Sequence, residues 1–174
     1  MKTYLIALLS FMTVAFSSCD LEGGANYTPD IFFLVNPVKN HTDTLNRYYT
    51  DKPDVYLMDS IVVGDTVSFV LYFEGYANNL LSFRMHTEPD SVAKIILPDQ
   101  AAMDTIFVSG TQYDKGIFKM SGTHSALVFP FRYIALKPSN SAKISFAVQS
   151  DAKFENMFGS NSNGFELKTP IKPR

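Results

Sequence analysis

The stretch Thr66-Val67-Ser68-Phe69-Val70-Leu71-Tyr72-Phe73-Glu74 decides the fold class of this 174-residue chain. Every second side chain, at Val67, Phe69, Leu71 and Phe73, is apolar, whereas serine, tyrosine and glutamate lie among the side chains between them. Successive side chains of a strand point to opposite faces, so a period of two predicts a strand with one face in a core. The Gly64-Asp65 pair directly before the stretch is typical of the turn that leads into such a strand.

The same period of two recurs further along the chain, in residues 81–86, 127–133 and 144–148. The core residues that it predicts there are Leu81, Phe83, Met85, Leu127, Phe129, Phe131, Tyr133, Ile144, Phe146 and Val148. Short turn sequences rich in Gly, Asn, Asp and Pro separate these stretches. Pro130 lies inside one of them and indicates a sheet edge or a bulge at that point, because proline has no N–H to donate.

No stretch of eleven or more residues has a clean helical stripe, and Lys153–Phe158 is the best candidate for a short helical turn. About eight or nine strands in one chain of this length favour a single antiparallel β-sandwich of immunoglobulin-like type. A closed β-barrel is the alternative.

Residues 1–18 have the features of a signal peptide. Lys2 adds a positive charge near the amino terminus, and Tyr4–Phe16 contains no charged residue. This apolar stretch is too short for a membrane-spanning helix, which needs about 20 residues. The following Ser18-Cys19 resembles the lipobox of bacterial lipoproteins, although that family usually has an aliphatic residue where Phe16 stands. The resemblance implies cleavage before Cys19 and lipid attachment to its thiol, while an ordinary signal peptide is the alternative.

These features divide the chain into three segments. Residues 1–18 are the expected signal peptide, residues 19–29 a polar, glycine-rich tether with lipidated Cys19, and residues 30–174 the β-sandwich domain. Cys19 is the sole cysteine, so the domain holds no internal disulfide and must be stabilised by its core. Without Lys2 the chain keeps 14 of its 15 basic residues beside 17 acidic ones, a balance that argues against a nucleic-acid-binding surface.

A search for catalytic or metal-binding motifs finds none. The three histidines, His41, His86 and His124, are too far apart in sequence for a paired metal-ligand motif, and there is no GxSxG nucleophile motif. Cys19 is unavailable as a nucleophile once acylated. No local motif pairs the glutamates with aspartates as in glycosidases, and two aspartate pairs lack the ligand density of a calcium loop. The glutamates are Glu22, Glu74, Glu88, Glu155 and Glu166, and the aspartate pairs are Asp51 with Asp54 and Asp99 with Asp104. We therefore expect no catalytic residue, metal or cofactor.

One short pattern occurs more often than chance predicts. Asp, then Ser or Thr, then an aliphatic residue is found five times, against roughly one expected from the composition. The triplet resembles the acceptor motif for O-linked glycans on exported Bacteroidetes proteins. The alternative is structural, because Asp closes a turn, Ser or Thr starts a strand, and the aliphatic residue is its first core residue. The candidate acceptors are Thr44, Ser60, Thr66, Ser91 and Thr105.

As a whole, the chain resembles small, uncharacterised surface lipoproteins of Bacteroidetes with an immunoglobulin-like domain. The residues that carry the resemblance, beside the lipobox, are 61–67 (IVVGDTV), 149–151 (QSD) and 169–171 (TPI). Acidic residues shortly after the lipidated cysteine, here Asp20 and Glu22, resemble the surface-display signal of that phylum. The resemblance implies an outer-membrane lipoprotein exposed at the cell surface.

The leading hypothesis for function is a lipid-anchored envelope protein whose sandwich is a non-catalytic binding or structural domain. Its partners would be the membrane, through the anchor, and another envelope protein or a glycan. A glycan-binding accessory protein is one alternative, with a platform formed by Tyr48, Tyr49, Tyr72, Tyr76 and Tyr113. A hydrolase whose site is assembled only in three dimensions is the other. A cleft with a His beside an acid would favour the hydrolase, and a flat strand face with exposed tyrosines would favour glycan binding.

Overall fold

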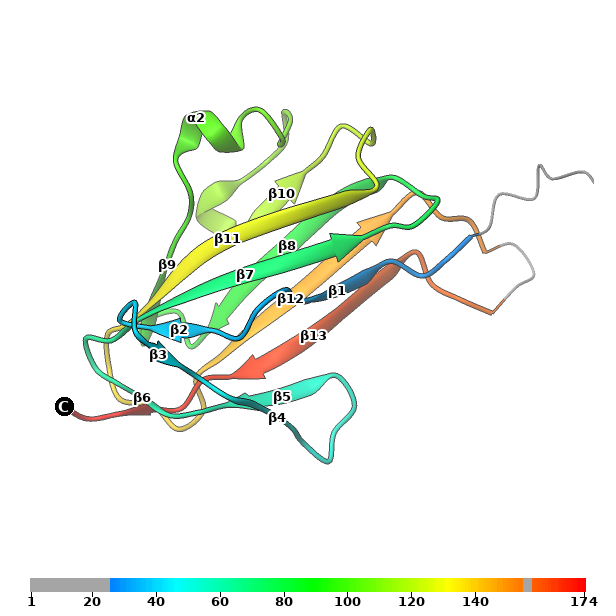
Figure 1. The fold of residues 1–174 in the computed structure, drawn as a ribbon. Coiled ribbons are helices and arrows are strands. Elements are labelled where there is room, and N and C mark those ends of the chain that lie inside the picture. The colour runs from blue at the N-terminus through cyan, green and yellow to red at the C-terminus, as the bar shows by residue number, and fades with distance from the viewer. Residues whose placement is uncertain (1–25, 155–157) are drawn as a thin grey trace, which may run out of the picture.

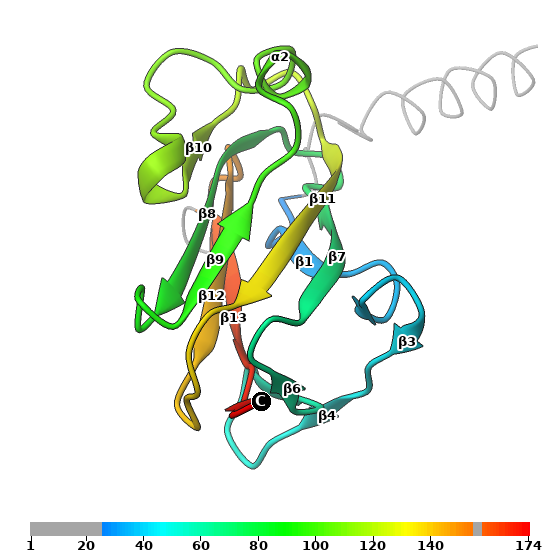
Figure 2. The same cartoon turned by 90° about the vertical axis from the view of Figure 1, so that its left-hand side faces the viewer.

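The computed structural model describes residues 26–154 and 158–174 of the protein. The expected signal peptide, Cys19, Asp20 and Glu22 lie outside the described residues. Two sheets face each other across a common core, as Figures 1 and 2 show from two directions. The predicted all-β sandwich is therefore confirmed. Both sheets stay open at their edges in the part of the chain that is described, so the alternative of a closed barrel is wrong.

One sheet, sheet A, is built around two long strands, β7 and β11. Its strands are β1 (Asp30–Phe33), β2 (Val38–Lys39), β3 (Asp43–Thr44), β7 (Thr66–Glu74), β9 (Ala93–Ile96) and β11 (Ala126–Ala135). They lie in the order β3-β2-β7-β11-β9, and β1 pairs with the second half of β7 while β2 pairs with its start.

The facing sheet, sheet B, has the order β10-β8-β12-β13-β5-β4. Its strands are β4 (Arg47–Tyr49), β5 (Val55–Met58), β8 (Leu80–Glu88), β10 (Ile117–Lys119), β12 (Lys143–Ser150) and β13 (Ser162–Lys168). A separate pair joins β6 (Ile61–Val62) to β14 (Ile171–Lys172). The pairs β5–β13 and β6–β14 are parallel, which departs from the expected antiparallel arrangement. A period of two reports which face of a strand is buried and says nothing about the direction of its neighbour.

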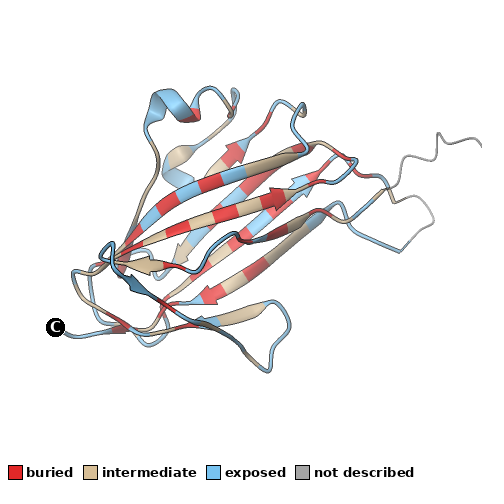
Figure 3. Ribbon diagram, in the orientation of Figure 1, coloured by how far each residue is buried: buried red, intermediate tan, exposed pale blue. Residues whose placement is uncertain are grey.

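The core consists mainly of phenylalanine rings contributed by both sheets. Phe69 and Phe73 of β7 and Phe83 of β8 are at most 1% exposed, and Figure 3 shows the buried positions alternating along the strands. The rings of Phe73 and Phe83 meet across the two sheets with centroids 4.5 Å apart. Tyr133 is fully buried, and its hydroxyl lies 3.0 Å from that of Thr169. The expected burial of Phe69, Phe83 and Tyr133 is confirmed.

The predicted core face of β8 differs from the observed one at its first residues. Leu80 is fully buried, whereas Leu81, the predicted core residue, is only half-buried. The register against β12 shifts at Gln149/Ser150, where Ser150 lies opposite Leu80 rather than Leu81. This irregularity inserts one residue into the alternation, which a strict period of two does not foresee.

Pro130 occupies an unpaired edge of β11, as its position in the sequence indicated. β9 pairs only with Arg132–Ala135, so the segment around Pro130 has no strand on that side. Val70, which lies opposite Pro130 on β7, directs its carbonyl to Leu34 on the far side of that strand. The two residues therefore share no ladder hydrogen bond, and the missing N–H of Pro130 costs the sheet nothing.

The helical content of the described residues is one four-residue helix, α2 (Gln100–Met103), and a 3₁₀ turn at Tyr113–Lys115. Asp99 caps α2 by accepting a hydrogen bond from the backbone of Ala101. The helical turn expected at Lys153–Phe158 includes residues 155–157, which lie outside the described residues. No helix within the described ranges is long and apolar enough to cross a membrane.

Candidate functional site

The sandwich has two ends that differ in character. At one end, which we call the tether end, Glu74 closes β7 opposite Asp30, the first residue of β1. The chain enters the domain here, because Asn26 accepts a hydrogen bond from the backbone of Lys153 and Thr28 accepts one from that of Ser160. The described part of the expected tether is thus fastened to the domain. The opposite, distal end holds the start of β7, the end of β8 and the C-terminus (Figure 1).

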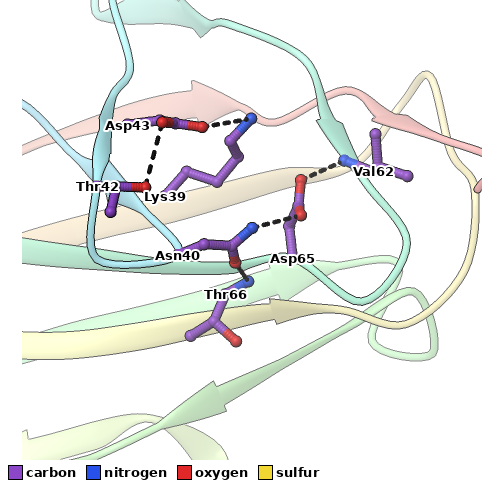
Figure 4. Close-up of polar contacts among 7 residues, drawn as sticks. All are labelled: Lys39, Asn40, Thr42, Asp43, Val62, Asp65 and Thr66. Carbon is purple, nitrogen blue, oxygen red and sulfur yellow. Dashed lines mark hydrogen bonds and ion pairs between the residues drawn. The ribbon is translucent and has the colours of Figure 1, made fainter.

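A network of polar contacts occupies the distal end (Figure 4). Asn40 and His41, both in the left-handed region at φ 49° and 69°, form the tight turn between β2 and β3. The side chain of Asn40 donates to Asp65 Oδ1 at 2.8 Å and accepts from the backbone N–H of Thr66 at 2.9 Å. Its backbone N–H donates to the carbonyl of Thr66. One asparagine therefore fastens the β2–β3 turn to the first residue of β7.

The carboxylate of Asp65 serves this network as an acceptor. Burial, the largest single influence, raises the pKa of the Asp65 carboxyl, whereas hydrogen bonds from the Val62 backbone and the Asn40 side chain lower it. The charges of Lys39 and Arg174 lower it further, so that the net pKa is below the ordinary value of an aspartate. Asp65 is therefore held in the ionised form that the turn between β6 and β7 requires.

The aspartates of the other triplets also hold local structure. Asp43 pairs with Lys39 at 3.3 Å. Asp59 accepts hydrogen bonds from the backbone and side chain of Asn46 and from the hydroxyl of Tyr48. Asp104 accepts from the side chains of Gln100 and Tyr113, both at 2.8 Å. Asp90 is the exception, because its one contact among the described residues is with His86 at 3.6 Å.

The residue after each of these aspartates lies at the surface. Thr44, Ser60, Ser91 and Thr105 are exposed and Thr66 is half-buried. The aliphatic residue that follows is buried in four triplets, at Leu45, Ile61, Val67 and Val92, and half-buried at Ile106.

The structural explanation of the triplet fits some of its occurrences and not others. Ser60 and Thr66 stand where β6 and β7 begin, and Ser91 lies two residues before β9. Thr44 ends β3 instead, and Thr105 lies in the turn after α2, where its hydroxyl donates to the carbonyl of Ala102. All except Thr105 lie at the distal end, a grouping that the sequence pattern did not reveal. Attachment of a glycan to any of the five stays a prediction.

The outer face of sheet A carries an apolar surface that the sequence reading missed. The strand register places its six side chains in two adjacent rows. One row consists of Phe32, Tyr72 and Val128, and the other of Leu34, Val70 and Pro130. Phe32, Leu34 and Val128 are 42%, 50% and 47% exposed. We call this surface the apolar face. The signal was present in β11, where Val128 and Pro130 occupy outward positions at which alternation calls for polar residues.

The five tyrosines proposed as a platform do not lie together. Tyr48 and Tyr49 are on β4 at the edge of sheet B, and Tyr113 begins the 3₁₀ turn beside β10. Tyr72 belongs to the apolar face, with its hydroxyl bonded to Glu74. Tyr76 lies in the next turn, and its ring contacts that of Tyr27 at 5.4 Å. A single platform of five tyrosines is therefore wrong, although smaller aromatic groups exist.

A cleft of about 560 Å³ opens between β8, β9 and the 3₁₀ turn. His86 and Asp90 stand on its rim 3.6 Å apart, the arrangement named above as favouring a hydrolase. Their side chains are 55% and 79% exposed, however, and the cleft lining contains neither serine nor cysteine. The lining also includes Thr87, Lys94 and Tyr113, so the hydrolase stays an alternative hypothesis. Among the residues that the structure describes, no three His, Cys, Asp or Glu side chains come together as metal ligands.

The chain matches no protein-family profile and no curated protein sequence. Three solved structures are similar to this chain. A DUF4466 family protein from Parabacteroides merdae is 11% identical, with a TM-score of 0.43, over 84% of this chain and 46% of that one. A PapD-like domain of human CEP192 is 9% identical over 86% and 88%, with a TM-score of 0.38. Domains 4 and 5 of the S-layer protein SbsC are 12% identical over 78% and 54%, with a TM-score of 0.30. All three are β-rich, and the chain spans about half the length of the first.

Proposed function

We propose that this protein is a lipid-anchored component of the bacterial cell envelope whose β-sandwich is a non-catalytic binding domain. The signal segment ending at Ser18-Cys19 supports the anchor, and the acidic Asp20 and Glu22 support display at the outer surface. The observation that carries a binding role is the apolar face of sheet A. Contiguous apolar patches of this kind on a soluble domain mark sites of contact with other molecules.

An anchor at Cys19 would orient the domain. Six residues lie between Cys19 and Asn26, so the seven residue-to-residue steps of an extended chain place the tether end within about 25 Å of the lipid. The distal end, with four of the five triplets, would then point away from the membrane. The apolar face runs along the side of the sandwich between the two ends, where a neighbouring envelope protein would have access to it.

The test compares equal substitutions inside and outside the apolar face. Leu34→Glu places a charge in the face at a side chain that is 50% exposed, and Leu136→Glu is the matched control at 46% exposure elsewhere. Each variant would be expressed in the native host, crosslinked on intact cells and isolated. We expect crosslinked partners of the wild-type protein to be lost in Leu34→Glu and kept in Leu136→Glu. Identical partners in both variants would rule out the apolar face as the binding surface.

Anchoring is tested separately with Cys19→Ala. We expect this variant to leave the membrane fraction while its domain stays folded. If it stays in the membrane fraction and still carries the lipid, the assignment of Cys19 is wrong even if the apolar face binds as expected.

A further inference from the structure

A small pocket between the two sheets contains an arginine, Arg47, that forms no ion pair with any carboxylate of the described residues. The pocket, of about 200 Å³, is formed by β1 of sheet A and by β4, β5 and β13 of sheet B. Arg47 lies within it, half-buried, and has no ion pair within the described residues. Its guanidinium carbon is 4.7 Å from the centroid of the Phe33 ring.

The Arg47 guanidinium makes a hydrogen bond to Asn36 and keeps one buried nitrogen without an acceptor among the described residues. One Nη donates to the side-chain oxygen of Asn36 at 3.3 Å, while Nε is buried and has no acceptor in the described structure. Burial lowers the pKa of the guanidinium, and the hydroxyls of Tyr56 and Tyr49 act in the opposite direction. Arginine nevertheless remains charged in proteins. The charge of this arginine thus lies at a pocket without a carboxylate partner among the described residues, where an anionic group of a ligand would be favoured.

Aromatic rings surround this charge. Phe33 and Phe165 form the inner wall, with centroids 5.3 Å apart, and Tyr56 contacts Phe165 at 5.4 Å. Tyr49 stands at the mouth with 85% of its surface exposed, tilted against Tyr56 at 5.1 Å. Exposed aromatic rings beside a binding pocket provide apolar surfaces on which flat-faced rings, including those of sugars, can stack.

From these observations we propose that the pocket binds a carboxylate on an acidic sugar, with Arg47 holding the carboxylate and Tyr49 stacking on the sugar ring. The planar guanidinium presents paired donors that match the two oxygens of a carboxylate. The cavity holds a few water-sized groups and not a whole oligosaccharide, so the rest of the sugar lies outside against Tyr49. The pocket borders the apolar face at Phe32, which belongs to both, and the proposal stands whether or not Cys19 is lipidated.

The decisive comparison removes the charge of the ligand and leaves its ring. D-Glucuronate and its neutral methyl ester would be titrated calorimetrically into the folded chain that lacks the signal segment. We expect the ester to bind roughly tenfold to a hundredfold more weakly, because it loses the contribution of a charge-assisted hydrogen-bond pair to the affinity. A tripeptide of glycine with a free C-terminal carboxylate tests the other source of the same chemistry. If this peptide binds as tightly as glucuronate, the ligand is a peptide terminus and the acidic-sugar assignment is overturned.

Two neighbouring tyrosines offer a matched pair of protein variants. Tyr49→Ala removes an exposed ring at the mouth of the pocket, so the fold should be kept while glucuronate binding weakens by about tenfold. Tyr48→Ala, one residue earlier on β4 and outside the pocket lining, should bind glucuronate as the wild type does. Arg47→Gln should abolish the difference between acid and ester. Equal affinity for acid and ester in the wild type, equal losses in both tyrosine variants, or no binding of glucuronate at all would each overturn the proposal.

Discussion

Replacing Phe83 by alanine should remove a large share of the stability of the domain. The side chain is fully buried at the centre of β8, and its ring contacts three other aromatic rings. These rings are Phe73 at 4.5 Å, Phe118 at 5.1 Å and Phe129 at 5.4 Å, which come from both sheets. Loss of a buried phenylalanine typically costs about 3–5 kcal/mol through lost transfer energy and the cavity left behind. Because each aromatic pair adds to this, we expect Phe83→Ala to lie near the upper end of that range.

Urea unfolding of the chain without its signal segment would measure the effect. Far-UV circular dichroism and tyrosine fluorescence are suitable probes, because the chain has no tryptophan. A loss of about 4 kcal/mol corresponds to a midpoint shift of about 2 M when the m-value is near 2 kcal/mol/M. Phe32→Ala is the matched control, since its ring is 42% exposed on the outer face of sheet A and should cost less than about 1 kcal/mol. Equal losses for the two variants would refute the assignment of faces.

Three further predictions concern the anchor, the triplets and the distal network. Cys19→Ala should abolish incorporation of a fatty-acid analogue in metabolic labelling, and equal labelling of the variant would contradict lipidation. At least one of Thr44, Ser60, Thr66, Ser91 and Thr105 should carry an O-glycan in the native host, and an intact mass equal to polypeptide plus lipid would contradict this. Asp65→Asn should lower the urea midpoint at neutral pH, because the depressed pKa of Asp65 makes its ionised form stabilising above the unfolded-state value of about 4. The difference between wild type and Asp65→Asn should shrink as the pH falls through the folded-state pKa, and a difference that grows in acid would refute the role of the carboxylate.

The strands and the core were predictable because they depend on an alternation that is visible in the sequence. The outward or inward direction of each side chain of β7 follows from the period of two, and the structure buries all four predicted residues. The same reasoning failed at Leu81, where a single inserted residue shifts the alternation at the start of β8, although Phe83 and Met85 are buried as predicted. The period of two also gives no information about which strands are neighbours. The parallel pairing of β5 with β13 could therefore not be predicted from it.

The candidate sites were much less predictable than the fold. Arg47 is an ordinary basic residue in the sequence, and its significance depends on Phe33 and Phe165, which are far away along the chain. Spacing rules find sites whose groups are close in sequence, whereas this pocket is assembled from four strands in two sheets. The apolar face is an intermediate case, because Val128 and Pro130 break the expected alternation and thereby mark the outward side of β11.

The structure also shows why the two explanations of the triplets are compatible and how they can be separated. In Asp65-Thr66 the carboxylate accepts hydrogen bonds from Asn40 and Val62, and Thr66 joins the network through its backbone N–H and carbonyl. The aspartate therefore has a structural task that does not need the threonine side chain. If the triplet has a structural role alone, Thr66→Ala should leave the turn intact and change the protein mass only by the substitution itself. Asp65→Ala should destabilise the turn between β6 and β7. Glycan attachment at Thr66 predicts instead that Thr66→Ala removes the mass of a sugar without loss of stability. The two substitutions together therefore separate the role of the aspartate from that of the threonine.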